Sequence, residues 1–391
     1  MQKILTLGII GGGQLGRMIC FDAHRLGFQT VVFTDHQNSP ASFATNQTII
    51  ADYSDKKALE KFASLVDVVT FEFENIPFEA ADFLASQVSF FPNPNILKIT
   101  QHRILEKNFL NLIGVKTTEY AEISSLEDLK KNLEKFEKAI LKTATMGYDG
   151  KGQFTLKIPS KSSNCDEHLT QIPSASSLNV CLDTPRLNTQ QSTPSISSQR
   201  DFEGILKNIA SQKLILEKFC PFDSEISVII ARAKSGGISC YEPLTNIHKN
   251  GILDESIYPA KISENLKIKA QEIAKKIAEK LELIGVLAVE FFVIGDELLV
   301  NELAPRPHNS GHFSMDGAIT SQFEQLIRAI TDLPLGSSKF HSQGSMKNLI
   351  GEEVLNLEKF YQNPHAKIHL YGKNEVKKGR KMGHVNILKP T

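Results

Sequence analysis

The feature that most constrains the fold is a strand–turn–strand pattern at residues 287–303 that carries one acidic side chain on each strand. LAVEFFVI is apolar, β-branched and aromatic, Gly295-Asp296 is a hairpin turn signal, and ELLVNEL predicts the returning strand. Glu290 and Glu302 therefore lie on neighbouring strands. A two-residue loop would place Asn301 across from Glu290, whereas a three-residue loop would place Glu302 there.

Two carboxylates on a rigid hairpin are hard oxygen ligands of the kind that Mg²⁺ takes when it is shared with substrate phosphates. The alternative is that Glu290 and Glu302 are solvent-facing residues of an ordinary hairpin. The segment that follows, APRPHNSGH, places Arg306 and two histidines around one glycine and two prolines. So many polar donors directly after a buried strand favour a binding loop over a spacer.

Length and composition exclude several classes of protein. The chain has 391 residues, which is too long for one core and predicts two or three domains. With 41% hydrophobic and 23% charged residues, a folded chain is expected. The formal net charge is zero, which argues against a nucleic-acid partner, because such proteins usually carry a basic excess. No apolar run reaches the roughly 18 residues of a membrane span, so no membrane partner is expected.

Cysteine usage and the N-terminal sequence predict a cytoplasmic protein. The five cysteines are odd in number and lack metal-ligand spacing, which predicts neither a disulfide framework nor a zinc site. MQKILTLGIIGGG is too short and glycine-rich for a signal peptide and predicts a first strand instead. A reducing compartment fits both observations.

The first strand runs into Gly11, Gly13 and Gly16, which have GxGxxG spacing and precede a predicted helix. This pattern alone would fit an NAD-binding βαβ unit, but a glycine loop at a helix N-terminus binds any phosphate, including that of a nucleotide monophosphate. An NAD-dependent dehydrogenase would rest on this loop alone, because no hydride-transfer constellation follows. Farther on, DVVTFEFENI places Glu72 and Glu74 on one face at a strand end, either on an edge strand or facing a ligand.

A second glycine loop, Met146 to Gln153, follows the predicted strand KAILKTA, which carries Lys142. Its glycines and cations predict a flap over a polyphosphate, although GxxxxGK[ST] spacing is absent; the alternative is a simple hairpin turn. Residues 159–199 are rich in Ser, Thr, Gln and Pro, which predicts a loop insertion or a disordered segment.

Several further segments carry candidate ligand residues. One helix is expected in the segment 93–115, carrying Arg103 and Lys107 and ended by Gly114. LILEKF predicts an edge strand whose backbone could pair with an adenine, and NIHKNG predicts a polar loop. The basic residues between 373 and 381 are either a solvated charge run or a phosphate clamp.

Taken together, GGGQLGRM, TFEFENIP, GYDGKGQ, LILEKF, NIHKNGIL, VNELAPRPHNSGH, LYGK and GRKMGHV resemble the N5-carboxyaminoimidazole ribonucleotide synthetases of the ATP-grasp superfamily. The resemblance implies an α/β fold with a Rossmann-like preATP-grasp domain at 1–100, an ATP-grasp domain at 101–335 with an insertion at about 159–200, and a small β-rich domain at 336–391. It implies an ATP-dependent carbon–nitrogen ligase that carboxylates 5-aminoimidazole ribonucleotide with bicarbonate, and a homodimer. The insertion departs from the family pattern.

The resemblance also implies a set of site residues. Mg²⁺ would be held by Glu290 and Glu302, and catalytic roles would fall to Arg306, Asp149 and His248. The ATP site would comprise Arg103, Lys142, Gly147, Tyr148, Asp149, Gly150, Lys151, Gly152, Gln153, Glu217, Lys218, Phe219, Cys220, Glu225, His248, Asn301 and Glu302. The ribonucleotide would contact Gly13, Gln14, Leu15, Glu74, Tyr148, Asp149, Lys373 and Arg380. The alternatives are another ATP-grasp ligase, such as a formate-using ribonucleotide transformylase, and a non-catalytic nucleotide-binding module.

Overall fold

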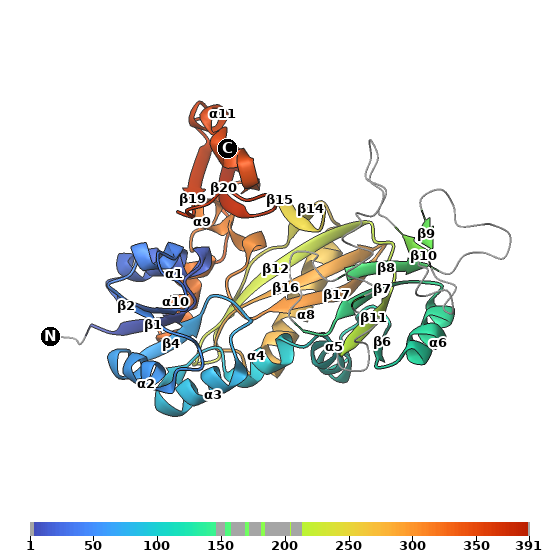
Figure 1. Ribbon diagram of the computed structural model, residues 1–391. Coiled ribbons are helices and arrows are strands. Elements are labelled where there is room, and N and C mark those ends of the chain that lie inside the picture. Colours follow the sequence, from blue (N-terminus) through green and yellow to red (C-terminus); the bar gives the residue numbers. More distant parts are fainter. Residues whose placement is uncertain are drawn as a thin grey trace. The chain divides into compact units, whose positions relative to one another are not determined.

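A computed structural model describes residues 4–145, 153–157, 169–171, 181–183, 204 and 213–389. These residues fall into two compact units (Figure 1). The larger unit comprises Met1–Gln101, Leu112–Val115 and Phe222–Thr391, and the smaller unit comprises His102–Asn111 and Lys116–Pro221. No helix within the described ranges combines the length and the apolar character that a membrane crossing requires.

The N-terminal part of the larger unit is a parallel sheet with the strand order β3-β2-β1-β4-β5. Its central strands are buried on both faces, which explains why β1 and β4 are mostly apolar rather than alternating. Helix α1 packs against one face, while α2 and α3 cover the other (Figure 1). The elements are β1 (Thr6–Ile10), α1 (Gln14–Arg25), β2 (Gln29–Thr34), η1 (Pro40–Phe43), β3 (Gln47–Ile50), α2 (Lys56–Leu65), β4 (Val68–Phe71), α3 (Phe78–Gln87), β5 (Ser89–Phe90) and α4 (Pro94–Thr100).

The prediction of a single helix in the segment 93–115 is wrong, because two helices form there. α4 ends at Thr100, and α5 (Arg103–Leu112) begins in the smaller unit. The backbone N–H of Arg103 donates to the carbonyl oxygen of Ala144 at 2.8 Å, which anchors the start of α5 to its own unit. The break therefore marks the passage of the chain from one unit to the other.

The remainder of the larger unit is a mainly antiparallel sheet with the order β17-β16-β12-β14-β15-β18-β20-β19, and β13 pairs with β12. β18 pairs with β15, so the C-terminal strands continue this sheet rather than forming one of their own. The elements are β12 (Ser224–Arg232), β13 (Ile238–Cys240), β14 (Leu244–Lys249), β15 (Ile252–Tyr258), α8 (Glu264–Lys280), β16 (Gly285–Ile294), β17 (Glu297–Ala304), η3 (Asn309–Gly311), α9 (Ser314–Gly317), α10 (Gln322–Ile330), β18 (Gly344–Ile350), η4 (Gly351–Leu355), α11 (Glu358–Tyr361), β19 (Ala366–Leu370) and β20 (Lys381–Leu388).

The β16–β17 hairpin combines a two-residue turn with a β-bulge. Gly295 and Asp296 form the turn, and Gly295 has φ +53, as a type II′ turn requires at its first central position. The register shifts next to Glu290, which leaves Asn301 as the extra residue on β17. Glu302 consequently lies opposite Glu290 even though the turn has only two residues.

The polar loop expected at NIHKNG is also wrong. Asn246 to Lys249 complete strand β14, and a tight turn at Asn250-Gly251 leads into β15. Asn250 and Gly251 have φ values of 54 and 74, the positive pair that a type I′ hairpin turn requires. His248 is therefore held on a strand.

The smaller unit is a sheet with the order β6-β11-β7-β8-β10-β9, whose core packs against α6. Two short strands lie inside the range 159–200, so the expectation of disorder is wrong for their six residues; the rest of that range lies outside the described residues. The elements are α5 (Arg103–Leu112), β6 (Tyr120–Ile123), α6 (Leu126–Phe136), β7 (Lys138–Thr143), β8 (Gln153–Lys157), β9 (Leu169–Gln171), β10 (Cys181–Asp183) and β11 (Leu214–Lys218).

Candidate active site

A row of polar side chains crosses three neighbouring strands of the larger unit. Glu302 on β17 lies opposite Glu290 on β16, and Glu290 lies opposite Ser227 on β12. Residues directly opposite on adjacent strands point to the same face. Burial and the facing charge of Glu302 raise the pKa of Glu290 to about 8. Glu290 is largely buried and Glu302 is exposed, and a cation between the two carboxylates would favour the ionised form of Glu290.

The hairpin acids suit a magnesium ion that is completed by phosphate oxygens. Glu290 and Glu302 offer hard oxygen ligands from two rigid strands, and the bulge residue Asn301 adds an amide oxygen donor. The described residues contain no group of three or more His, Cys, Asp or Glu side chains that could hold a metal by themselves. This donor set therefore fits Mg²⁺ bound jointly with a substrate better than a closed structural site.

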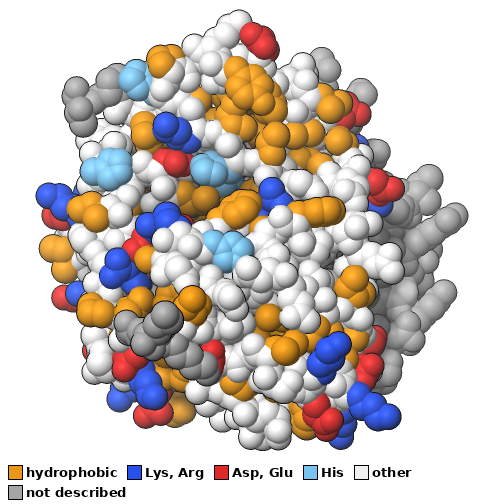
Figure 2. All heavy atoms as spheres, turned by 90° about the vertical axis from the view of Figure 1, so that its left-hand side faces the viewer, with side chains coloured by type: hydrophobic (Ala, Val, Ile, Leu, Met, Phe, Trp, Pro, Cys, Tyr) orange, Lys and Arg blue, Asp and Glu red, His pale blue; other side chains and the backbone are white. Residues whose placement is uncertain are grey.

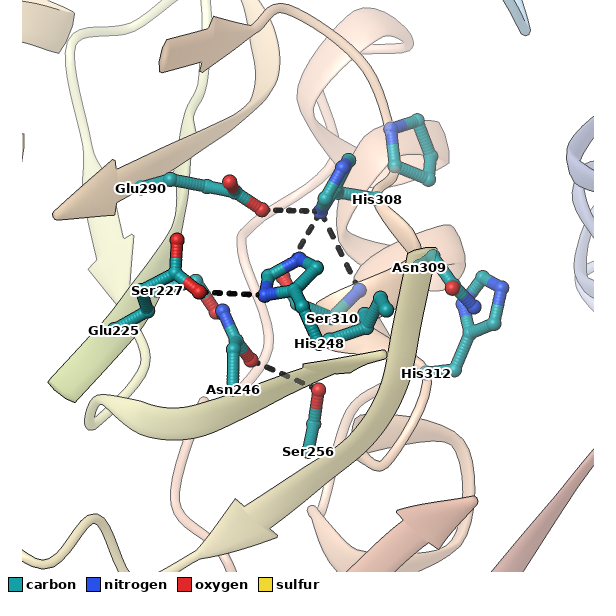
Figure 3. A network of polar contacts seen from close by, with 12 residues as sticks. Glu225, Ser227, Asn246, His248, Ser256, Glu290, His308, Asn309, Ser310 and His312 are labelled. Carbon is teal, nitrogen blue, oxygen red and sulfur yellow. Dashed lines mark hydrogen bonds and ion pairs between the residues drawn. The ribbon is translucent and has the colours of Figure 1, made fainter. Parts of the chain in front are cut away.

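Two histidines, His248 and His308, lie near Glu290 (Figure 3), and their surroundings shift their pKa values in opposite directions. His248 Nδ1 lies 2.7 Å from Glu225 Oε2. Burial alone would lower the pKa of His248, but the hydrogen bond and charge of Glu225 outweigh it, and the pKa is raised. His308 Nδ1 lies 3.6 Å from Glu290 Oε1, and burial, reinforced by Arg306, holds its pKa well below the ordinary value.

Arg306 connects the loop after β17 with the segment after β4. Its Nε donates to a carboxylate oxygen of Glu74, and its Nη1 donates to the carbonyl oxygen of Pro307 at 3.1 Å. Burial opposes the charge of Arg306, but Glu74, Glu302 and Glu72 outweigh it and raise its pKa. The guanidinium is thus held ionised and oriented, which suits the binding of an anion.

The N-terminus of α1 binds a carboxylate of the chain itself. The N–H groups of Gly13 and Gly16 donate to the two oxygens of Glu72 at 2.6 and 3.1 Å. A dinucleotide pyrophosphate would need this position at the end of a GxGxxG loop. The interpretation of the loop as an NAD site is therefore excluded by the geometry of Glu72.

Three charged side chains share one buried position in the smaller unit. Lys142 Nζ on β7 lies 3.0 Å from Glu217 Oε2 on β11, and Lys107 Nζ on α5 lies 3.7 Å from the same oxygen. Burial lowers the pKa of Lys107. Burial would raise the pKa of Glu217, but Lys142 and Lys107 together lower it to about 2. The cluster carries an excess of one positive charge, which suits a phosphate ligand.

The other predicted site residues are distributed as follows. Lys373 Nζ donates to the carbonyl oxygen of Lys381 at 2.7 Å, and Arg380 Nη1 donates to that of Glu375 at 3.0 Å. Lys218 pairs with Glu119 at 2.7 Å on the surface of the smaller unit. Also in that unit, Arg103 begins α5, Gln153 begins β8, the ring of Phe219 lies beneath Lys138 at 3.9 Å, and Cys220 follows β11 with a pKa raised by burial. Gly147, Tyr148, Asp149, Gly150, Lys151 and Gly152 lie outside the described residues.

The sequence did not assign roles to four residues that the structure places in these clusters. Lys381 begins β20, and its charge acts on Glu290, His248 and His308. The basic run at 377–381 could have indicated Lys381, but Arg380 was the residue of that run predicted to lie in the site. Lys107 lies one helical turn after Arg103, so their i, i+4 spacing could have paired them. Glu72 and His308 are each two residues from a predicted site residue, Glu74 and Arg306 respectively. No local sequence pattern identified the side chains or backbone groups that they contact.

A small pocket of about 190 Å³ lies elsewhere in the larger unit, between α1 and β19. It is smaller than the roughly 300–1,000 Å³ of typical small-molecule sites. None of the predicted site residues lines it. The pocket is lined by Arg17, Met18, Phe21, Met315, Ile368, His369, Leu370 and Tyr371.

Acidic and basic side chains are interspersed on the face of the molecule shown in Figure 2.

Known protein families match three successive parts of the chain. The ribonucleotide synthetase preATP-grasp domain matches residues 4–101, and the ATP-grasp domain matches residues 108–178 and 191–323. The phosphoribosylaminoimidazole carboxylase C-terminal domain matches residues 344–391. An N5-carboxyaminoimidazole ribonucleotide synthase of Brucella melitensis is 40% identical over 98% of this chain and 96% of that protein. The chain belongs to the N5-carboxyaminoimidazole ribonucleotide synthase family.

Further similarities agree with membership of this family. A bifunctional purine synthesis protein of Dictyostelium discoideum is 40% identical over 97% of this chain, which spans 36% of that longer protein. The crystal structure of an N5-carboxyaminoimidazole ribonucleotide synthetase as its ADP complex is 38% identical, with a TM-score of 0.85 over 100% of this chain and 94% of that chain. The Aspergillus clavatus enzyme in complex with ADP and 5-aminoimidazole ribonucleotide is 29% identical, with a TM-score of 0.82 over 100% and 95%. The α/β ATP-grasp fold predicted from the sequence is confirmed.

Proposed function

We infer that this protein carboxylates 5-aminoimidazole ribonucleotide with bicarbonate at the expense of ATP, giving N5-carboxyaminoimidazole ribonucleotide, ADP and phosphate in purine synthesis. The observation that carries this inference is the facing pair Glu290 and Glu302, flanked by His248 and by Arg306, in a chain that aligns with such enzymes over nearly its whole length. ATP is assigned as the co-substrate because the chain contains an ATP-grasp domain and because a similar synthetase was crystallised as its ADP complex.

The reaction needs bicarbonate to become a better electrophile. An oxygen of bicarbonate attacks the γ-phosphorus of ATP, the bond to the ADP oxygen breaks, and carboxyphosphate forms. Carboxyphosphate either loses phosphate to release CO₂, which the exocyclic amine of the ribonucleotide attacks, or is attacked by that amine directly with phosphate as the leaving group. Both routes form the carbamate, and the amine gives up a proton. Most of the catalysis is therefore positioning and charge stabilisation, as in other phosphoryl transfers.

The charged residues of the larger unit suit these steps. Mg²⁺ held by Glu290 and Glu302, with Asn301 beside them, would neutralise charge on the phosphates. Arg306, oriented by Glu74, would hold the bicarbonate-derived anion. Further residues proposed for ATP on these strands are Glu225 and His248, whose hydrogen bond fixes the imidazole.

The proposed ATP contacts of the smaller unit centre on Lys142 and Glu217, whose ion pair holds the ammonium group in place. The remaining ATP residues proposed there are Arg103, the loop from Gly147 to Gln153, Lys218, Phe219 and Cys220. The residues proposed for the ribonucleotide are Gly13, Gln14, Leu15, Glu74, Tyr148, Asp149, Lys373 and Arg380, and the last two would bind its phosphate.

We further propose a homodimeric protein of the cytoplasm, with the domain boundaries 1–100, 101–335 and 336–391. Its relatives include a purine-synthesis protein, and free thiols at Cys20, Cys220 and Cys240 suit a reducing compartment. Sedimentation at several protein concentrations tests the dimer, and a monomer throughout would contradict it.

The test of the function is ADP release with Mg-ATP and bicarbonate, with and without 5-aminoimidazole ribonucleotide. Strong stimulation by the ribonucleotide, with loss of its free amine, is the expected result. ATP turnover that ignores the ribonucleotide would overturn the substrate assignment and turn attention to a formate-using transformylase reaction. Replacing bicarbonate by formate in the same assay separates the two activities.

A further inference from the structure

Two of the three glycines in the GxGxxG spacing, Gly11 and Gly13, make room for the side chain of Glu72, and Gly16 makes room for the backbone of Gly11. A Cβ added at Gly11 would lie 2.4 Å from Glu72 Cγ, and one at Gly13 would lie 2.4 Å from Glu72 Oε1. At Gly16 a Cβ would lie 3.5 Å from Glu72 Cγ and 2.9 Å from the carbonyl oxygen of Gly11. In dinucleotide-binding proteins such glycines admit a pyrophosphate. Here the same absence of side chains admits a carboxylate from the segment directly after β4.

Glu72 acts as a remote cap for helix α1. Gly13 occupies the N-cap position and has no side chain that could accept a hydrogen bond from the first turn. Glu72 takes that role from outside the helix by accepting from the N–H groups of Gly13 and Gly16. Its own N–H donates to the carbonyl oxygen of Ile10 at 3.0 Å, which fixes the backbone beside the loop. Glu72 as a whole residue is 7% exposed.

This arrangement divides the first-turn N–H groups of α1 into two pairs. Glu72 satisfies those of Gly13 and Gly16, whereas those of Gln14 and Leu15 have no acceptor within the described part of the chain. The positive end of the helix dipole and these two donors suit an anion. Burial raises the pKa of Glu72, and the hydrogen bonds from Gly16 and Gly13 oppose this rise. The charges of Arg306 and Lys373 also oppose it, so both cations lie within electrostatic range of Glu72.

We propose that Glu72 is a positioning residue for the ribonucleotide: it occupies the pyrophosphate position of the glycine loop and thereby aims the N–H groups of Gln14 and Leu15 at the substrate phosphate. The loop is consequently closed to dinucleotides and open to a monophosphate. This inference rests on the proposed function, because it deepens the role given there to Gln14 and Leu15.

Glu72→Gln tests the proposal, because an amide has one acceptor oxygen and can keep only one of the two N–H contacts. The Michaelis constant for the ribonucleotide is expected to rise by about tenfold or more, while that for ATP stays within about twofold, since a hydrogen bond to a charged group is lost only at the ribonucleotide loop. Glu72→Asp keeps the charge and should recover part of the affinity. A ribonucleotide constant within twofold of wild type overturns the proposal.

A matched control separates positioning from loss of a helix cap. Asp55 caps α2 of the same parallel sheet by accepting from the N–H of Ala58 at 3.1 Å, outside the proposed site. Asp55→Ala should lower the melting temperature without changing either Michaelis constant. If Glu72→Gln lowers stability and weakens both substrates equally, the role of Glu72 is only structural and the proposal fails.

A crystal structure of the wild-type protein with the ribonucleotide decides the matter even if the variants do not fold. The expected result is a phosphate on the N–H groups of Gln14 and Leu15, with Glu72 still bound to Gly13 and Gly16. A phosphate that displaces Glu72, or that binds elsewhere, would overturn the proposal. Failure of the proposed function is distinguishable, because the wild-type protein would then show no ribonucleotide-stimulated ADP release.

Discussion

Glu217→Gln is expected to destabilise the protein much more than Lys107→Met, although both substitutions remove a member of the same buried cluster. One carboxylate is shared by two lysines there, with Lys142 at 3.0 Å and Lys107 at 3.7 Å. Removing Glu217 leaves Lys142 without its ion-pair partner and leaves Lys107 with the weaker charge interaction of Glu106. Removing Lys107 leaves Glu217 paired with Lys142 and also removes an ammonium group that was costly to bury.

The size of the effect follows from the pKa of Glu217. Folding lowers it from 4.5 to about 2, which corresponds to about 3 kcal/mol at about 1.4 kcal/mol per unit. Breaking a buried pair by removing one partner typically costs about 3–5 kcal/mol. We therefore expect a loss of about 3–5 kcal/mol for Glu217→Gln and a change within about 1 kcal/mol for Lys107→Met.

The pH dependence has a definite sign. The pKa of Glu217 is depressed in the folded state, so its contribution to stability is fully present above about pH 4.5 and is lost as the pH falls towards about 2. In Glu217→Gln, the already lowered pKa of Lys107 should fall further, because the charge of Glu217, the largest opposing effect, is gone. Folding then opposes the charged form of Lys107, and the variant should regain stability as the pH rises through the alkaline range.

Scanning calorimetry of the two single variants and of the double variant checks this reasoning. The double variant Glu217→Gln/Lys107→Met should recover much of the stability lost in Glu217→Gln, since one of the two cations that lost the charge of Glu217 is removed. Equal losses in Glu217→Gln and Lys107→Met would refute the shared-carboxylate argument. A double variant no more stable than Glu217→Gln, with no gain at high pH, would do the same.

Three further outcomes are expected. Glu302→Gln should abolish turnover and leave the far-ultraviolet circular dichroism unchanged; activity above about one tenth of wild type would refute the metal role, since a ligand charge is removed. Glu225→Gln should lower the pKa of His248, because its hydrogen bond and charge raise it, and an NMR titration of the imidazole that shows no fall would contradict this. Gly344→Ala places a Cβ 2.0 Å from the carbonyl oxygen of Ile387 and should lower the melting temperature far more than Gly27→Ala, which meets nothing within 4 Å; equal losses by calorimetry would count against the strand packing.

Periodicity and turn chemistry predicted much of the larger unit. The apolar run of β1, the glycine loop and the β16–β17 hairpin follow directly from residue spacing. The detailed pairing of the hairpin did not, because the bulge at Asn301 lets a two-residue turn place Glu302 opposite Glu290. Nothing in the local sequence marks a bulge of this kind, since its position depends on both strands and on their neighbours.

Polar composition was the misleading signal at NIHKNG. The Asn250-Gly251 pair predicts a type I′ hairpin turn, and the structure has one. The side chains that suggested a loop are polar because they face a polar cluster: His248 bonds to Glu225, and Asn246 accepts from Ser256 at 2.9 Å. A strand next to a charged site can therefore have the composition of a loop, and turn chemistry is the better guide there.

Glu72 and Glu74 show where a periodic pattern stops being informative. Their alternation with phenylalanines predicted one shared face at the end of a strand, but β4 ends at Phe71, so the period of two no longer applies to them. Glu72 turns to the glycine loop at α1, and Glu74 bonds to Arg306 of the loop after β17. Two carboxylates only two residues apart thus hold two loops that are far apart in the sequence. The segment after β4 therefore contacts two loops at once, the glycine loop before α1 and the loop after β17. The sequence of either loop alone does not identify this shared contact, because the partners are far apart in the chain.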